Sequence, residues 1–222
     1  MNNPASFIDH TLLSPTTTEI QVSALCEEAV EYGFATVCIP PVFVPLAAAR
    51  LYGSQVKVCS VVGFPCGYST CREKVQETSD LIAHGAKEID MVVQIGYLLG
   101  GNFKAVEDEI AQIVIAANRL PVKVIIECCY LSTALMQTAT ELVVKAGADF
   151  VKTSTGFGPS GATLNDVKRL VGASAGRIAV KAAGGIRTLD ECRTFIEAGA
   201  ARIGTSSGVA IVAEWQRREL VR

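Results

Sequence analysis

Two lysines interrupt apolar stretches of the sequence that are typical of buried strands. Lys152 lies in "GADFVKTSTGFG" (147–158), and Lys181 lies in "GRIAVKAAGGIR" (176–187). A buried ammonium group is costly unless it is paired or neutralised. Burial and a neighbouring cation both lower the pKa of a lysine. We therefore expect one of the two to offer a neutral amine that attacks a carbonyl carbon.

An acidic residue completes this set. Asp90 lies within the apolar segment "KEIDMVV" (87–93). A Schiff base on a lysine acts as an electron sink and stabilises a carbanion on the neighbouring carbon as an enamine. A carboxylate can take and return the protons of such a reaction, directly or through water. Two lysines and one acid therefore suffice for a metal-free aldolase.

Two glycine- and serine-rich segments near the end of the chain predict what the substrate carries. They are "AAGGIRT" (182–188) and "RIGTSSGVA" (202–210), and each precedes a predicted helix. Small residues let backbone N–H groups approach an anion, and the N-terminus of a helix favours it electrostatically. We therefore predict a phosphate group on the substrate.

The elements that must position these residues follow a recurring pattern. Helical segments end at a glycine that is followed closely by an apolar strand, at Gly33, Gly85, Gly147 and Gly199. Counting the other apolar runs gives eight strands, which start near residues 7, 34, 56, 88, 122, 149, 177 and 201. Strands that alternate with helices indicate a parallel sheet. Eight such units predict an α/β fold, a single (β/α)8 TIM barrel over residues 1–222, with its chemistry at the carboxyl ends of the strands. An open doubly wound sheet is the alternative, but no G-x-G-x-x-G turn follows the first strand.

Local signals support the predicted helices. The segments "TTTE" (16–19) and "TLDE" (188–191) have the pattern of capping boxes. The first helix has one apolar stripe, formed by Val22, Leu25, Cys26, Ala29 and Tyr32.

Composition excludes several classes of protein. The net charge is −2, and no basic cluster suggests binding to nucleic acid or to a membrane surface. The N-terminus does not have the pattern of a signal peptide, and no apolar run reaches the length of a membrane span, so we expect a cytoplasmic protein. The eight cysteines contain no C-x-x-C pair and the two histidines lie far apart, so we expect no metal site.

Six motifs together resemble one known family. They are "IDHTLL", "VVGFPCG", "KEIDMVV", "FVKTSTGFG", "VKAAGGIRT" and "RIGTSSG", and the resemblance runs from about residue 7 to 212. The family is that of the deoxyribose-phosphate aldolases. The resemblance implies a class I aldolase without a cofactor, which cleaves 2-deoxy-D-ribose 5-phosphate reversibly to D-glyceraldehyde 3-phosphate and acetaldehyde. It also implies a homodimer or homotetramer.

The resemblance implies a role for each matching residue. Lys152 would form the Schiff base, Lys181 would tune it and join the proton relay, and Asp90 would donate and accept protons. The substrate would meet Cys38, Asp9, Thr11 and Thr155, with Asp9 and Thr11 at the barrel mouth. The phosphate would bind to Gly156, Gly184, Gly185, Gly204, Ser206 and Ser207.

The chain departs from the family pattern at four positions near the predicted mouth. Ser14 replaces a common lysine, Pro40 and Gln94 replace common asparagines, and Cys128 replaces a usual threonine. None of the four is a catalytic group, so the departures bear on contacts to the acceptor aldehyde and on loop geometry.

Three other functions remain open at this stage. A Schiff-base barrel for another keto or aldehyde phosphate would carry similar lysines and loops. A pyridoxal-phosphate barrel would also use a lysine imine, but it would leave Lys181 without an obvious role. A non-catalytic sugar-phosphate binding protein would be expected to lose Lys152, Lys181 or Asp90, and all three are present.

Overall fold

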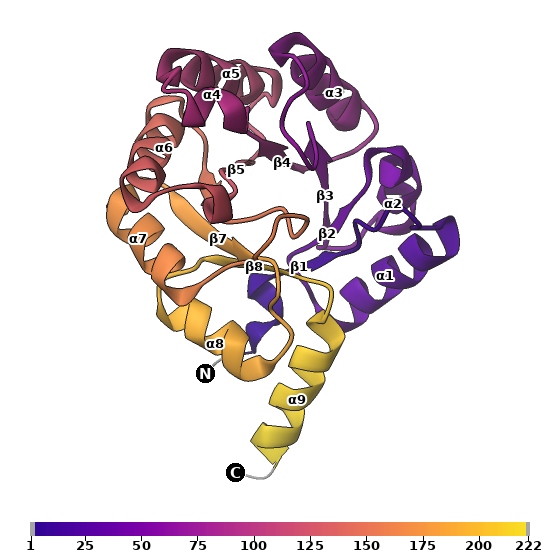
Figure 1. The fold of residues 1–222 in the computed structure, drawn as a ribbon. Helices are drawn as coiled ribbons and strands as arrows, with labels where there is room; N and C mark the ends of the chain where they lie inside the picture. The colour runs from indigo at the N-terminus through magenta and orange to yellow at the C-terminus, as the bar shows by residue number, and fades with distance from the viewer. Residues whose placement is uncertain (1–2, 221–222) are drawn as a thin grey trace.

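The computed structural model describes residues 3–220 and contains a closed parallel barrel of eight strands (Figure 1). The strands follow one another in sequence order, and β8 pairs with β1 to close the sheet. Their bounds are Ile8–Thr11, Thr36–Ile39, Lys57–Val62, Glu88–Val92, Val122–Ile125, Phe150–Lys152, Ala179–Ala183 and Arg202–Thr205 for β1 to β8. The predicted TIM barrel is confirmed, and every strand starts within two residues of its expected position.

Helices surround the barrel as an outer ring (Figure 1). Their bounds are Glu19–Tyr32, Val44–Arg50, Cys71–Ala83, Ile95–Leu99, Phe103–Ala116, Thr133–Lys145, Leu164–Ser174, Leu189–Glu197 and Gly208–Leu220 for α1 to α9. Short 3-10 helices cover Pro4–Phe7 (η1), Pro41–Phe43 (η2) and Cys128–Tyr130 (η3). No helix among the described residues is long and apolar enough to cross a membrane.

The helix ends follow local sequence signals, with one correction. The glycines expected after helices all have positive φ, at 71° for Gly33, 111° for Gly85, 81° for Gly147 and 102° for Gly199. The capping box at Thr188 and Glu191 is confirmed in α8. The box expected over residues 16–19 is wrong, because α1 begins two residues later with Thr18 and Gln21 as the capping pair. A turn in which the Thr17 amide donates to the Ser14 carbonyl takes up the residues before it.

Apolar side chains fill the layer between the barrel and the helices. In α1, Val22, Leu25, Cys26 and Ala29 are buried as expected, whereas Tyr32 is half-buried. Inside the barrel the packing is different, because charged side chains lie there. Asp9, Glu88, Asp90, Lys123 and Lys181 are all buried. Barrel interiors are usually filled by branched apolar residues, so these charges need a functional explanation.

Candidate active site

A single carboxylate joins the two lysines that the sequence singled out. Lys152 and Lys181 are register partners on the neighbouring strands β6 and β7. Both Nζ atoms lie 2.7 Å from the same oxygen of Asp90, Oδ2, which reaches them from β4. All three residues are buried, and Lys152 is the one that lines a cavity. The structure therefore brings together the expected nucleophile, second lysine and acid.

A third lysine lies in the same cluster, and the sequence analysis missed it. Lys123 of β5 donates from Nζ to Asp90 Oδ1 at 2.9 Å and lies 2.7 Å from Glu88 Oε2. Its signal was present, because a lysine also interrupts the apolar segment "PVKVIIECC" (121–129). Lys123 occupies the second oxygen of Asp90 and so leaves Oδ2 to Lys152 and Lys181.

Asp9 is not at the barrel mouth, which corrects the expectation. Its side chain is fully buried, with Oδ2 2.5 Å from Lys181 Nζ and Oδ1 2.6 Å from a guanidinium nitrogen of Arg202. Arg202 also lies 3.3 Å from Glu88, so the ion pairs form one connected network. Alternate residues of a barrel strand point inward, and Asp9 is on the inward side of β1. It therefore contacts the second lysine and not the cavity.

Opposing effects set the charge states within this network. Burial alone would raise the pKa of Asp90, but Lys123, Lys152 and Lys181 hold it well below its usual range. Burial would lower the pKa of Lys181, but Asp9 and Asp90 outweigh burial and raise it. The pKa of Lys123 is raised in the same way, with Asp90 as the main partner. Lys181 therefore remains a cation, as expected of the lysine that supplies the positive charge beside the nucleophile.

A count of charges in the barrel interior singles out Lys152. Four basic groups, Lys123, Lys152, Lys181 and Arg202, share three carboxylates. With every group ionised, the network carries one excess positive charge. Of the four basic groups, Lys152 is the one on the cavity wall, where a substrate carbonyl can reach it. An uncharged amine at this position is the state that attacks a carbonyl carbon.

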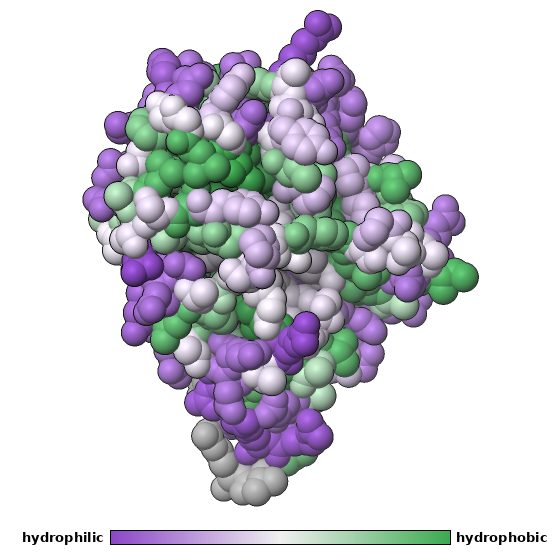
Figure 2. Space-filling view, viewed as in Figure 1, coloured by the Kyte–Doolittle hydropathy of each residue, from purple (hydrophilic) through white to green (hydrophobic). Residues whose placement is uncertain are grey.

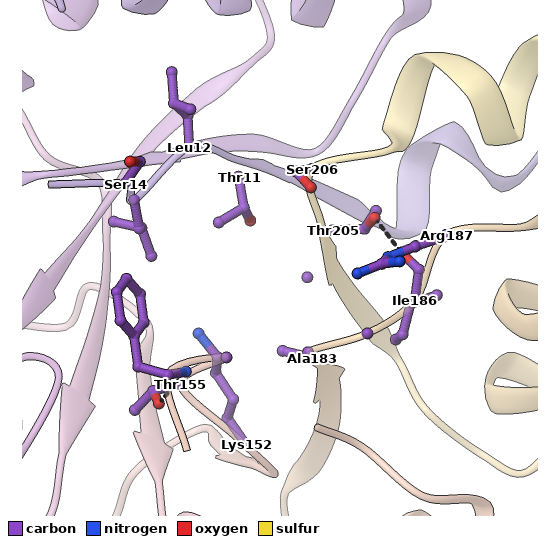
Figure 3. Close-up of a pocket in the computed structure, with 16 residues that line it drawn as sticks. Thr11, Leu12, Ser14, Lys152, Thr155, Ala183, Ile186, Arg187, Thr205 and Ser206 are labelled. Atoms are coloured by element: carbon purple, nitrogen blue, oxygen red, sulfur yellow. Dashed lines mark hydrogen bonds between the residues drawn. The ribbon is translucent and has the colours of Figure 1, made fainter. Parts of the chain in front are cut away.

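The cavity lies at the carboxyl ends of the strands and has a volume of about 370 Å³ (Figure 3). Seven of the residues expected to bind substrate or phosphate line it: Thr11, Thr155, Gly156, Gly184, Gly185, Gly204 and Ser206. Leu12, Leu13, Ser14 and Phe157 form part of the remaining wall. The glycines and Ser206 lie together at one end, as a phosphate site requires.

Two further expected residues do not line the cavity. Cys38 is fully buried, and Cys59 is its register partner on the neighbouring strand. The amide of Ser207 donates to Thr205 Oγ1 at 2.9 Å, so it is turned back onto its own loop. Cys38 is therefore enclosed, whereas Ser207 is partly exposed next to the cavity residue Ser206.

Arg187 is a second residue that the sequence analysis did not assign. It lies between β7 and α8 and lines the cavity. Figure 3 shows it next to Ile186 and Thr205, on the wall opposite Lys152. A guanidinium group binds phosphate oxygens in a bidentate manner. Its position directly after the paired glycines in "GGIRT" was the available signal.

One group of side chains has donor atoms that a metal ion could use. Cys38, Cys59 and Asp90 place a ligand atom each within 4.8 Å of one another. Asp90 already accepts hydrogen bonds from three lysines, and Cys59 Sγ donates to its Oδ1 at 3.1 Å. A cation here would meet three ammonium groups, so the charge of the surroundings opposes metal binding.

The fold and the site together define a class of protein, the lysine-dependent aldolases built on a (β/α)8 barrel. Comparison with known proteins gives the family. The chain belongs to the DeoC/LacD aldolase family, whose family model matches residues 5–214.

Relatives of known sequence or structure support the assignment. The chain is 49% identical to the deoxyribose-phosphate aldolase of a Thermoanaerobacter species, over 98% of this chain and 99% of that protein. A solved aldolase structure has 38% identity and a TM-score of 0.96, covering all of this chain and 99% of the other. The tetrameric deoxyribose-phosphate aldolase of Aeropyrum pernix has 36% identity and a TM-score of 0.90, over 96% and 91% of the two chains.

Proposed function

We propose that this aldolase cleaves 2-deoxy-D-ribose 5-phosphate reversibly to D-glyceraldehyde 3-phosphate and acetaldehyde, through a Schiff base on Lys152. The observation that carries the proposal is the placement of Lys152. Its Nζ lies 2.7 Å from Asp90, on the wall of a cavity whose other end holds Gly184, Gly185 and Arg187. A sugar phosphate can place its aldehyde at the amine and its phosphate at the glycines.

The side chains around Lys152 supply the groups that the reaction needs. The Lys152 amine adds to the C1 carbonyl, and loss of water gives the imine. The C3 hydroxyl then loses its proton, the C2–C3 bond breaks, and its electron pair moves onto the imine to form an enamine. D-Glyceraldehyde 3-phosphate leaves, C2 takes up a proton, and water releases acetaldehyde from the lysine. Asp90 is held by three ammonium groups and is a weak base, so we assign it proton exchange through water, together with Lys181.

Phosphate binding rests on three features of the same end of the cavity. Gly184 and Gly185 have φ angles of 89° and 81°, which other residues rarely adopt, and they precede the capped N-terminus of α8. The first amides of α8 already donate to the side chains of Glu191, Glu214 and Thr188, so the helix contributes to anion binding through its dipole. Arg187 adds a formal positive charge. We assign the phosphate to these residues together with Gly156, Gly204 and Ser206.

Borohydride trapping tests the proposal. The protein is incubated with 2-deoxy-D-ribose 5-phosphate, reduced with borohydride, and digested for peptide mass spectrometry. We expect one adduct, confined to the peptide that contains Lys152 and absent in Lys152→Ala. The matched control is Lys168→Ala, because Lys168 is an exposed lysine on α7. A correctly folded protein that forms no adduct would contradict the assigned nucleophile.

The same trapping experiment, together with an absorbance spectrum of the purified protein, separates the remaining alternatives. An adduct on Lys152 with other aldehyde or keto phosphates, but not with this sugar, would keep the mechanism and reject the substrate. An absorbance band near the visible in the purified protein would indicate pyridoxal phosphate. Neither outcome is expected.

We further propose that the protein is a cytoplasmic homodimer or homotetramer, without nucleic-acid or membrane partners. The net charge of −2 offers no basic surface for such partners. Figure 2 shows apolar side chains gathered near α4 and α6, whereas α8 and α9 are mostly hydrophilic. Tyr97, Leu99 and Tyr130 are among the exposed apolar residues of the α4 and η3 elements. Exposed apolar surface of this kind is typical of subunit contacts.

A further inference from the structure

Glu127 is a buried acid close to the cavity that the mechanism does not use. It follows β5 and has φ 53° and ψ 70°, a left-handed backbone conformation that residues other than glycine rarely adopt. The residue is only 2% exposed. Such a conformation costs free energy and persists where the surroundings require it. Its side-chain contacts show what the conformation achieves.

The Glu127 carboxylate holds one residue of the cavity wall, Thr155. It accepts from the Thr155 amide at 3.2 Å through Oε2 and at 3.3 Å through Oε1. The Thr155 hydroxyl donates to the same Oε2. The hydroxyl oxygen of Thr155 in turn accepts from the amide of Phe157 at 3.0 Å. Thr155 and Phe157 both line the cavity.

Once these bonds are formed, the Thr155 hydroxyl can make only one further hydrogen bond. A hydroxyl has one proton and two lone pairs. The proton is directed to Glu127 and one lone pair receives the Phe157 N–H, so one lone pair is free. A carboxylate such as Glu127 can only accept hydrogen bonds. If the Thr155 hydroxyl turned its proton toward another group, its hydrogen bond to Glu127 would be lost. Thr155 can therefore accept a hydrogen bond from a substrate but cannot donate one.

We propose that Glu127 is a positioning residue that makes Thr155 a selective acceptor for a substrate hydroxyl group. The inference rests on the proposed function and deepens it. Thr155 lies beside Lys152 in Figure 3 and is followed by Gly156 at the phosphate end of the cavity. A substrate group that lies between the imine carbon and the phosphate would face Thr155. We assign it to the C4 hydroxyl of the sugar, which is the 2-hydroxyl of D-glyceraldehyde 3-phosphate.

The test compares two acceptor aldehydes in the same enzyme preparation. Addition of acetaldehyde is measured with D-glyceraldehyde 3-phosphate and with 3-oxopropyl phosphate, which lacks the 2-hydroxyl. The ratio of the two kcat/KM values is independent of the fraction of folded enzyme. In Glu127→Gln, the side-chain amide can donate to Thr155 Oγ1 and release the threonine proton. We expect the preference for the hydroxylated acceptor to fall about tenfold, the size of one lost hydrogen bond.

Two further variants keep the inference falsifiable if Glu127→Gln does not fold. Thr155→Val removes the acceptor and should lose the same preference, whereas Thr155→Ser should restore it. The double variant of Glu127→Gln and Thr155→Val should lose no more than either alone. The matched control is Glu141→Gln, because Glu141 is an exposed acid on α6, and its ratio should equal that of the wild type.

The outcomes separate this inference from the proposed function. Trapping of acetaldehyde on Lys152 in each variant shows that the nucleophile is in place. An unchanged acceptor ratio in Glu127→Gln or in Thr155→Val, with trapping intact, would overturn the role of Glu127. Absence of trapping in the wild type would instead reject the aldolase mechanism itself.

Discussion

At the scale of single residues, Asp90 accepts hydrogen bonds from three lysines, and all three lower its pKa. Lys123 does not line the cavity and is bound to Asp90 and Glu88. Its role is to neutralise Asp90 and Glu88, whereas Lys152 and Lys181 are assigned to the reaction. A substitution of Lys123 should therefore be seen first as a change in the free energy of unfolding.

We predict that Lys123→Met lowers the free energy of unfolding by about 3–5 kcal/mol, because it removes a buried partner that Asp90 and Glu88 share. The control is Lys57→Met, since Lys57 lies 3.9 Å from the same Glu88 but has a side chain that is 56% exposed. Exposed pairs contribute about 0–1 kcal/mol. Urea unfolding measures both variants. Equal stability of the two would show that the network does not depend on Lys123.

The shifted pKa values predict how this stability varies with pH. Asp9 has a lowered pKa: burial opposes the shift, but Lys181, Lys123 and Arg202 outweigh it. An acid with a lowered folded pKa stabilises the protein above its unfolded pKa of about 3.9, and this contribution is lost as pH falls further. We therefore expect the stability difference between wild type and Asp9→Asn to be constant from about pH 5 to 9 and to shrink below about pH 4. A difference that changes near pH 7 would contradict the assigned charge states.

The sequence predicted the centre of the site but not its surroundings. Lys152, Lys181 and Asp90 stood out because charged residues interrupted apolar runs. Lys123 carries the same signal, because it also interrupts an apolar run. The partners of a buried charge depend on which side chains face inward around the whole barrel, and one sequence does not show this.

At the scale of elements, the loop after β6 supports the loop after β7. A Cβ atom on Gly161 would lie 2.2 Å from the carbonyl oxygen of Gly184. The amide of Ala162 donates to the same oxygen at 3.1 Å. The phosphate end of the cavity is therefore positioned by close backbone contact between two loops.

We predict that Gly161→Ala raises KM for 2-deoxy-D-ribose 5-phosphate roughly tenfold or more, since small displacements of binding groups are costly. Imine formation with acetaldehyde should persist, because Lys152 lies on β6 before this loop. The control is Gly172→Ala within α7, where a Cβ meets nothing within 4 Å. That change should stabilise the helix by about 0.5–1 kcal/mol. An unchanged KM in Gly161→Ala would exclude a positioning role for the contact.

Elements were easier to predict than their ends. Helix and strand periods, with glycines after the helices, located every strand closely. The predicted start of α1 is two residues early because both Thr16 and Thr18 have the Glu or Gln of a capping box three residues on. The local turn in which Thr17 donates to Ser14 occupies the residues before Thr18 and leaves Thr18 as the N-cap.

At the scale of the whole molecule, sedimentation tests the proposed assembly. We expect a dimer or larger species at micromolar concentration, and a monomer alone would refute it. The exposed apolar residues near α4 supply a matched variant. Leu99→Lys should weaken association, whereas Leu220→Lys on the hydrophilic α9 should not, although Leu220 is 87% exposed.

The ionic network also fixes when the enzyme becomes reactive. Its members come from β1, β4, β5, β6, β7 and β8. Asp9 therefore cannot pair with Arg202 until the chain has been synthesised as far as β8. A chain still emerging from the ribosome has most of these charges in water, where its lysines remain protonated like any others. The network around Lys152 and Asp90 is therefore complete only when the last strand joins the first, and an unfinished chain lacks the assembled site at which the finished enzyme handles aldehydes.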